Sequence, residues 1–145
     1  MIPEDPIADS VSCRLESSFA MPKLCEGYEA RYLHMLQPTL HDPGSKVISD
    51  KERTKGMPDG EFDERVVRGY GLLRQGIKEL RERGVESHDT SFLFEGIDAP
   101  IYTDSCHFGK RGNHLVADKL IELIRNCGSG RTSEAIVDSR LRESR

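Results

Sequence analysis

An aspartate and a histidine lie three residues apart just before a strongly amphipathic stretch of the chain, residues 110–125. Aliphatic side chains recur there at the spacing of one wide helical face, and burying each of them contributes roughly 1.5–3 kcal/mol. The stretch therefore predicts a helix that packs against other elements. With His107 as proton acceptor and Asp104 orienting its imidazole, the loop before that helix can hold two members of a serine-hydrolase triad.

Plainer roles for these residues stay open. Asp104 suits a helix N-cap or a turn, and His107 can be a loop histidine with its hydrogen bonds satisfied. A metal site could combine Cys106, His107, His114 and a distant cysteine, although their spacing matches no usual zinc pattern. No metal or other cofactor is predicted.

The residues around the pair resemble the C-terminal block of the SGNH (GDSL-type) hydrolases. The similarity consists of an apolar lead-in, the acid, the base, a Gly-Asn pair and a small residue in the helix: Ile101, Tyr102, Asp104, Cys106-His107, Gly112-Asn113 and Ala117. Residues 32–40, YLHMLQPTL, are similar to a late core strand of some members. Together the similar parts cover roughly residues 24–126, and the resemblance implies that Asp104 is the orienting acid and His107 the general base.

Two blocks of the family pattern are missing. The family begins with a buried strand that ends in Gly-Asp-Ser, and a Gly-x-Asn-Asp block supplies an oxyanion donor. The chain has only two asparagines, Asn113 and Asn126, both in or beside the predicted last helix. Ser10, in Ala8-Asp9-Ser10, follows two prolines and two acids, which do not suit a central strand, so we expect a solvated serine rather than the nucleophile.

Composition excludes several partners. The net charge is −4, and no run of basic residues interleaved with aromatics is present, so no nucleic-acid partner is expected. No apolar stretch reaches membrane-spanning length, and the acidic start does not resemble a signal peptide, so localisation is left unassigned. The four cysteines form no Cys-x-x-Cys pair and are expected to be ordinary thiols.

The pattern along the chain alternates strands and helices. We expect an irregular head over residues 1–21, a partial hydrolase-like domain over 22–127 and a polar, disordered tail over 128–145. Within the domain we expect a strand at 30–36, a disordered or lid-like loop at 41–60, a helix at 62–83 ended by Gly84, a strand at 85–90, an apolar knot at 92–94 and a helix at 110–125.

This order predicts an α/β protein, the C-terminal part of a three-layer α/β/α flavodoxin-like fold with an incomplete parallel sheet. By resemblance the function is ester hydrolysis, with an ester of unknown acyl or sugar type as substrate and a chain that is inactive alone. The alternative is a non-catalytic remnant or a partner-binding fragment of such a hydrolase. Strands without neighbours would expose a sheet edge, which favours self-association.

Overall fold

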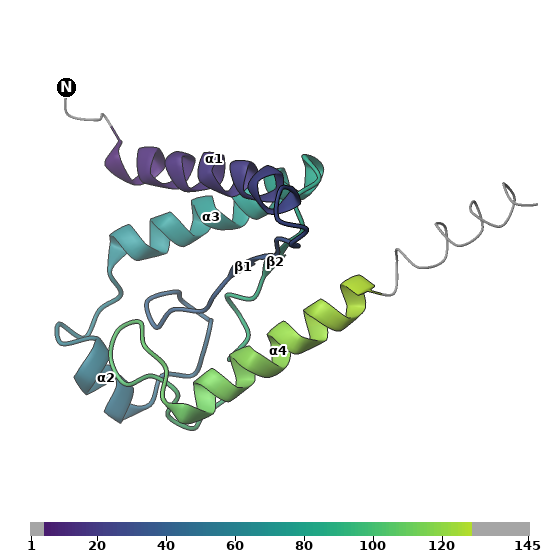
Figure 1. Cartoon of the computed structure of the whole chain (residues 1–145). Coiled ribbons are helices and arrows are strands. Elements are labelled where there is room, and N and C mark those ends of the chain that lie inside the picture. The colour runs from purple at the N-terminus through teal and green to yellow at the C-terminus, as the bar shows by residue number, and fades with distance from the viewer. Residues whose placement is uncertain (1–4, 129–145) are drawn as a thin grey trace, which may run out of the picture. The chain divides into compact units, whose positions relative to one another are not determined.

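The computed structural model describes residues 5–128. In this part of the chain the elements follow in the order α1 (Pro6–Glu26), β1 (His34–Leu36), α2 (Asp50–Gly56), α3 (Glu64–Glu82), β2 (Ser87–Asp89) and α4 (Lys110–Gly128) (Figure 1). The α/β class is therefore confirmed in general terms. The chain divides after Gly109 into two compact units, and α4, which belongs to the second unit, is described by itself.

Helix α1 lies where an irregular head is predicted over residues 1–21, and that prediction is wrong from Pro6 onward. The Asp5 side chain caps the helix by accepting a hydrogen bond from the amide of Ala8 at 3.1 Å. Pro6 occupies the first turn, where its missing N–H is not needed and its fixed φ suits the helix. The prolines argue against a strand, but one of them begins a helix. The predicted domain boundary at residue 22 falls inside α1.

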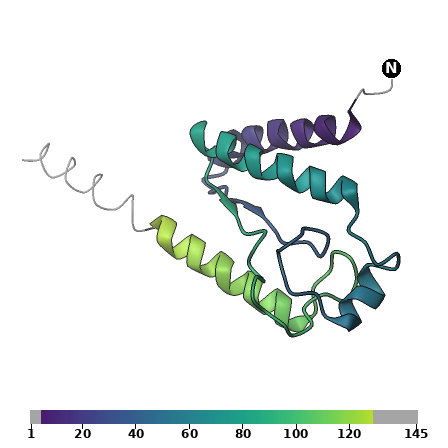
Figure 2. The same cartoon turned by 180° about the vertical axis from the view of Figure 1, so that it is seen from behind.

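Helix α3 forms the centre of the core, because it contacts α1 and both strands (Figure 2). The buried cluster joins it to the sheet and consists of Leu36, Ile77, Leu80 and Val85. Gly76 lets α1 approach closely, since a Cβ at this position would lie 2.5 Å from Cδ2 of Leu15. The predicted helix is confirmed, although Asp63 is its N-cap and Phe62 precedes it.

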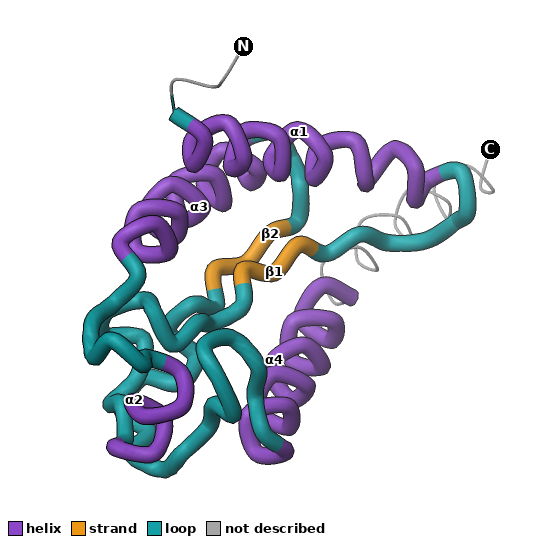
Figure 3. Tube along the Cα trace, turned by 90° about the vertical axis from the view of Figure 1, so that its left-hand side faces the viewer, coloured by secondary structure: helices purple, strands orange, loops and turns teal. Residues whose placement is uncertain are grey.

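The two strands pair in parallel, with His34 opposite Ser87 and Leu36 opposite Asp89 (Figure 3). The predicted strands are confirmed as shorter segments. Between them the chain passes through α2 and α3, as a parallel pair requires a long crossover connection. Gly84 ends the crossover with a φ of 82°, a conformation that glycine adopts without a steric penalty.

The segment at 41–60 is ordered and contains a helix, so the expectation of a disordered loop there is wrong. It contains α2, which begins with a capping box: the Ser49 hydroxyl accepts from the amide of Glu52, and the Glu52 carboxylate accepts from the amide of Ser49 at 3.0 Å. Buried polar groups help to order this segment, in which Met57 is also buried. Asp42 is 1% exposed and pairs with Arg74 of α3 at 2.5 Å.

Helix α4 confirms the predicted last helix and extends it to Gly128. Lys119 and Glu122 form an ion pair on its surface at 2.7 Å. The predicted tail therefore overlaps the helix at Gly128, and the rest of it, residues 129–145, lies outside the described residues. None of the helices in the described range is long and apolar enough to cross a membrane.

Candidate functional site

The Asp104–His107 pair lies at the tip of a tight hairpin. Tyr102 and Phe108 form an antiparallel bridge, and the amide of Thr103 donates to the carbonyl of His107 at 2.9 Å. The apolar lead-in has a structural role here, because Tyr102 is 4% exposed and its ring packs edge to face on Phe94 and Phe108. The buried aromatic residues at the foot of the hairpin thus hold its polar tip in solvent.

Glu52 of α2 anchors the foot of the hairpin at Ile101 and Tyr102, although α2 and the hairpin are far apart in sequence. Its Oε1 accepts from the backbone amides of Ile101 at 2.8 Å and Tyr102 at 3.0 Å. Its Oε2 lies 3.0 Å from Nζ of Lys46, and both side chains are completely buried. Burial alone would raise the pKa of Glu52, but hydrogen bonds from Ser49, Tyr102 and Ile101 outweigh it and lower the pKa to about 2.

We expect acid to weaken the fold through Glu52. Its pKa falls from an ordinary 4.5 to about 2 on folding, so its contribution is complete above pH 4.5 and is lost as the pH falls toward 2. That contribution is on the order of 3 kcal/mol. At neutral pH, Glu52→Gln should destabilise by about 3–5 kcal/mol, because it leaves the Lys46 ammonium buried without its counterion. Urea unfolding of both proteins from acidic to neutral pH measures the difference.

Two controls accompany this measurement. Glu82→Gln removes an exposed carboxylate at the end of α3 and should change stability by no more than about 0.5 kcal/mol. Lys46→Met combined with Glu52→Gln removes both buried charges and should recover part of the loss. If Glu52→Gln alone unfolds like the parent protein at neutral pH, the buried pair does not anchor the hairpin.

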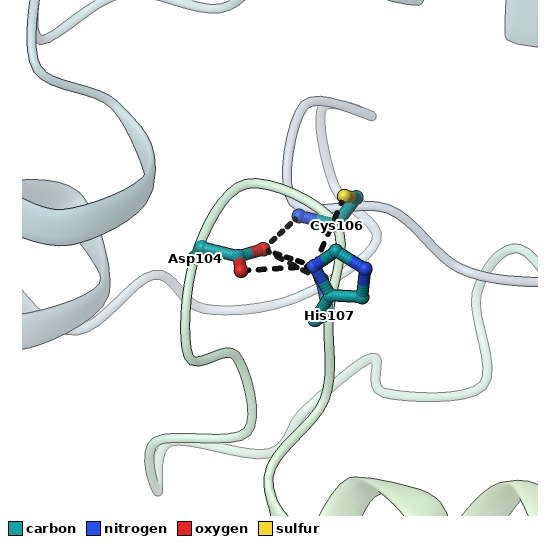
Figure 4. A group of neighbouring side chains, drawn as sticks. All are labelled: Asp104, Cys106 and His107. Atoms are coloured by element: carbon teal, nitrogen blue, oxygen red, sulfur yellow. Dashed lines mark hydrogen bonds and ion pairs between the residues drawn. The ribbon is translucent and has the colours of Figure 1, made fainter.

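The Asp104 carboxylate organises the tip of the hairpin (Figure 4). Oδ1 accepts from the amides of Cys106 at 2.9 Å and His107 at 2.8 Å, while Oδ2 lies 2.9 Å from Nδ1 of His107. The two backbone donors, followed by the imidazole, hold the pKa of Asp104 well below its usual range. An ionised carboxylate therefore faces one imidazole nitrogen and favours a proton there.

The other nitrogen of His107, Nε2, has no hydrogen-bond partner among the described residues. The side chain is 77% exposed, so Nε2 is open to solvent. With the proton on Nδ1 held by Asp104, Nε2 carries the free lone pair that a general base needs. Asp104 and His107, the two predicted site residues, are thus in contact, and they lie only three positions apart in one turn.

The orientation of the Cys106 side chain differs from the expected one. The cysteine side chain is expected to point away from the imidazole, but Sγ lies 3.6 Å from Nδ1 of His107 (Figure 4). That expectation is wrong, because the Asp104-centred turn gathers the side chains of residues 104, 106 and 107 on one side. The thiol lies beside Nδ1 and not Nε2, so it is no nucleophile for a base at Nε2.

Gly56, the last residue of α2, lets the hairpin approach the helix closely. A Cβ at this position would clash with Cδ2 of Leu40 and lie 2.9 Å from the carbonyl oxygen of Asp104. The second of these neighbours is backbone, so it cannot move aside without moving the tip of the hairpin. The absence of a side chain at residue 56 therefore helps to position the acid.

Gly56→Ala should destabilise the protein by about 1–3 kcal/mol through this overlap, which exceeds the roughly 1 kcal/mol gained in helix propensity. Gly71→Ala is the matched control, because it is a helical glycine with open space around its Cβ and should be neutral or stabilising. Urea unfolding compares the two. Equal changes in the free energy of unfolding for the two variants would show that the close approach of Gly56 to Asp104 does not contribute to stability.

An open hollow of about 580 Å³ adjoins Asp104 and Ser105 and is lined mostly by residues 55–65. His41 supports its wall: Nδ1 accepts from the amide of Asp63 at 3.0 Å, and Nε2 donates to the carbonyl of Gly56 at 3.0 Å. Since both nitrogens are engaged, His41 positions neighbouring segments, which is consistent with an ordinary packed histidine.

The remaining candidates lie elsewhere. Ser10 sits in α1, and its hydroxyl donates to the carbonyl of Pro6 at 2.7 Å; no hydrogen bond connects it with Asp104 or His107 in the described residues. Sequence reasoning missed Lys46, Glu52 and Gly56. Of these three residues, only Glu52 belongs to a recognisable sequence pattern, the Ser-x-x-Glu of a helix capping box.

No family model, no curated protein and no solved structure matches the chain. The geometry of the hairpin therefore carries the functional interpretation.

Proposed function

We propose that the chain carries the acid and base of an SGNH-type ester hydrolase, with Asp104 as orienting acid and His107 as general base. The observation that supports this most is the 2.9 Å contact between Oδ2 of Asp104 and Nδ1 of His107, combined with an exposed Nε2 that has no partner among residues 5–128. This is the arrangement that activates a serine hydroxyl placed at Nε2.

In the proposed reaction, Nε2 of His107 takes the proton of a serine hydroxyl as the serine oxygen attacks the ester carbonyl. The Asp104 carboxylate stabilises the imidazolium, which then gives its proton to the departing alkoxide. Water repeats the sequence on the acyl-enzyme. The polar hollow beside Asp104 is a candidate place for part of the ester substrate.

The α/β fold class is consistent with this proposal. The parallel pair β1–β2 with α3 packed on both strands supports this proposal, because doubly wound sheets are built by repeating strand–helix–strand units of this kind. A three-layer flavodoxin-like fold would add strands to this pair. The hairpin follows β2 in the chain, and active-site loops in such folds follow the carboxyl ends of strands.

The sequence contains no Gly-Asp-Ser block and no Gly-x-Asn-Asp block. In this proposal the serine and the oxyanion donors are therefore supplied by another segment or another chain. The alternative function, a non-catalytic remnant or a partner-binding fragment, rests on the same absence. A coding sequence upstream of Met1, or a separate chain, that bears both blocks would favour the hydrolase.

Complementation tests the proposal directly. The N-terminal segment of an SGNH hydrolase, with its Gly-Asp-Ser and Gly-x-Asn-Asp blocks, is supplied in cis or in trans, and hydrolysis of p-nitrophenyl acetate is measured. We expect activity that disappears with His107→Ala. Activity that survives this substitution would contradict the assigned base, and a folded complex without activity would favour the remnant.

A further inference from the structure

Three different metal-ligating side chains meet at the tip of the hairpin. The carboxylate of Asp104, the thiol of Cys106 and the imidazole of His107 each offer one atom, and these atoms all lie within 4.8 Å of one another (Figure 4). The set differs from the one considered from sequence, which includes His114 and a distant cysteine. We propose that the tip is a zinc(II) site with these three ligands.

The distance from Cys106 to His107 fits an edge of a small coordination polyhedron, and the distance from Asp104 to His107 is slightly shorter than such an edge. Zinc bonds of 2.0–2.3 Å to oxygen, nitrogen and sulfur in a tetrahedron place neighbouring ligand atoms about 3.3–3.8 Å apart. Sγ of Cys106 lies 3.6 Å from Nδ1 of His107, and Oδ2 of Asp104 lies 2.9 Å from the same nitrogen. A small widening of the second distance, where a proton now lies, admits the metal ion.

The backbone already holds the carboxylate in the orientation that a ligand needs. Oδ1 accepts from the amides of Cys106 and His107, so Oδ2, which lies 2.9 Å from Nδ1 of His107, is the oxygen that would bind the metal once Nδ1 has lost its proton. Such outer contacts orient a ligand and raise affinity. The ligands occupy positions i, i+2 and i+3 of one turn, so little further ordering of the chain is required.

The chemistry of the set selects the metal. One thiolate, one imidazole nitrogen and one carboxylate oxygen suit zinc better than calcium or magnesium, which prefer oxygen alone. Three protein ligands leave the fourth position for water. On binding, the Cys106 thiol releases its proton to solvent, and the imidazole proton moves from Nδ1 to Nε2, so the histidine remains neutral. The zinc-bound form therefore has no free lone pair on Nε2, and zinc binding excludes the base role proposed above for His107.

The site does not depend on ester hydrolysis, and its test needs no activity. The full chain is prepared with Cys13, Cys25 and Cys127 changed to serine, so that Cys106 is the only thiol. Cobalt(II) is titrated as a spectroscopic probe under reducing conditions, and zinc(II) is titrated in competition with it. We expect one ion per chain and a sulfur-to-cobalt charge-transfer band.

Three variants and one matched control decide the outcome. Loss of outer contacts alone costs 10–100-fold in affinity, so Asp104→Asn, Cys106→Ser and His107→Ala should each weaken zinc binding at least about tenfold. All three side chains lie at an exposed tip, and circular dichroism verifies that the variants are folded. His114→Ala, an exposed histidine of α4, should change affinity less than about twofold.

The proposal is overturned if the charge-transfer band persists in Cys106→Ser, or if any of the three variants binds zinc as tightly as the parent. A larger loss with His114→Ala than with His107→Ala would also overturn it, since the ion would then be bound by other ligands. None of these three results bears on whether His107 can act as a base in a complemented hydrolase without zinc.

Discussion

The chain by itself is expected to hydrolyse p-nitrophenyl acetate no faster than its Asp104→Ala, His107→Ala double variant. A general base without an attacking hydroxyl cannot form an acyl-enzyme, and complete hydrolases owe rate enhancements of about 10⁶-fold or more to the assembled site. Initial rates at equal protein concentration, after subtraction of the spontaneous rate, provide the comparison.

Ser10→Ala is the matched control, because Ser10 belongs to the one Asp-Ser pair near the start of the chain and is exposed in α1. It should behave like the parent. A parent rate well above that of the double variant would contradict the prediction, and loss of that rate in Ser10→Ala would identify Ser10 as the nucleophile.

In the complemented hydrolase, substitutions of the acid and the base should be strongly non-additive. His107→Ala removes the proton acceptor and should lower kcat by on the order of 10⁶-fold, whereas Asp104→Ala should cost about 10⁴-fold. The double variant should be no slower than His107→Ala alone, because Asp104 acts only by holding the imidazole. Single-turnover rate constants for the four proteins measure the coupling.

Cys106→Ser serves as the control in that cycle and should keep most of the activity. The Cys106 sulfur contacts Nδ1 of His107 and not Nε2, so it lies away from the position proposed for the attacking hydroxyl. If activity instead disappears with Cys106→Ser, or survives His107→Ala, the roles assigned to this hairpin are wrong.

Local patterns predicted the elements whose formation depends on nearby residues. The periodic apolar face of α3, its end at Gly84 and the helix predicted at residues 110–125, which extends to Gly128, follow from contacts within a few turns. The prediction of an irregular head is wrong because proline disfavours a central strand but is well suited to the first turn of a helix, where Pro6 lies.

The prediction of disorder at residues 41–60 is wrong for a different reason. Its low apolar content indicated disorder, but a buried ion pair between Lys46 and Glu52 and a buried Asp42 order it. Charged residues are usually exposed, and only partners brought from elsewhere in the chain make their burial tolerable. Composition therefore gave no sign of this part of the core.

The sequence by itself determined the contact between Asp104 and His107, because three residues and one Asx-type turn suffice to form it. Tertiary structure alone decided how that turn is supported. Glu52 reaches the backbone of Ile101 across 49 residues of chain, and Gly56 leaves room for the carbonyl of Asp104. Such contacts depend on the path of the whole chain, which no local pattern specifies.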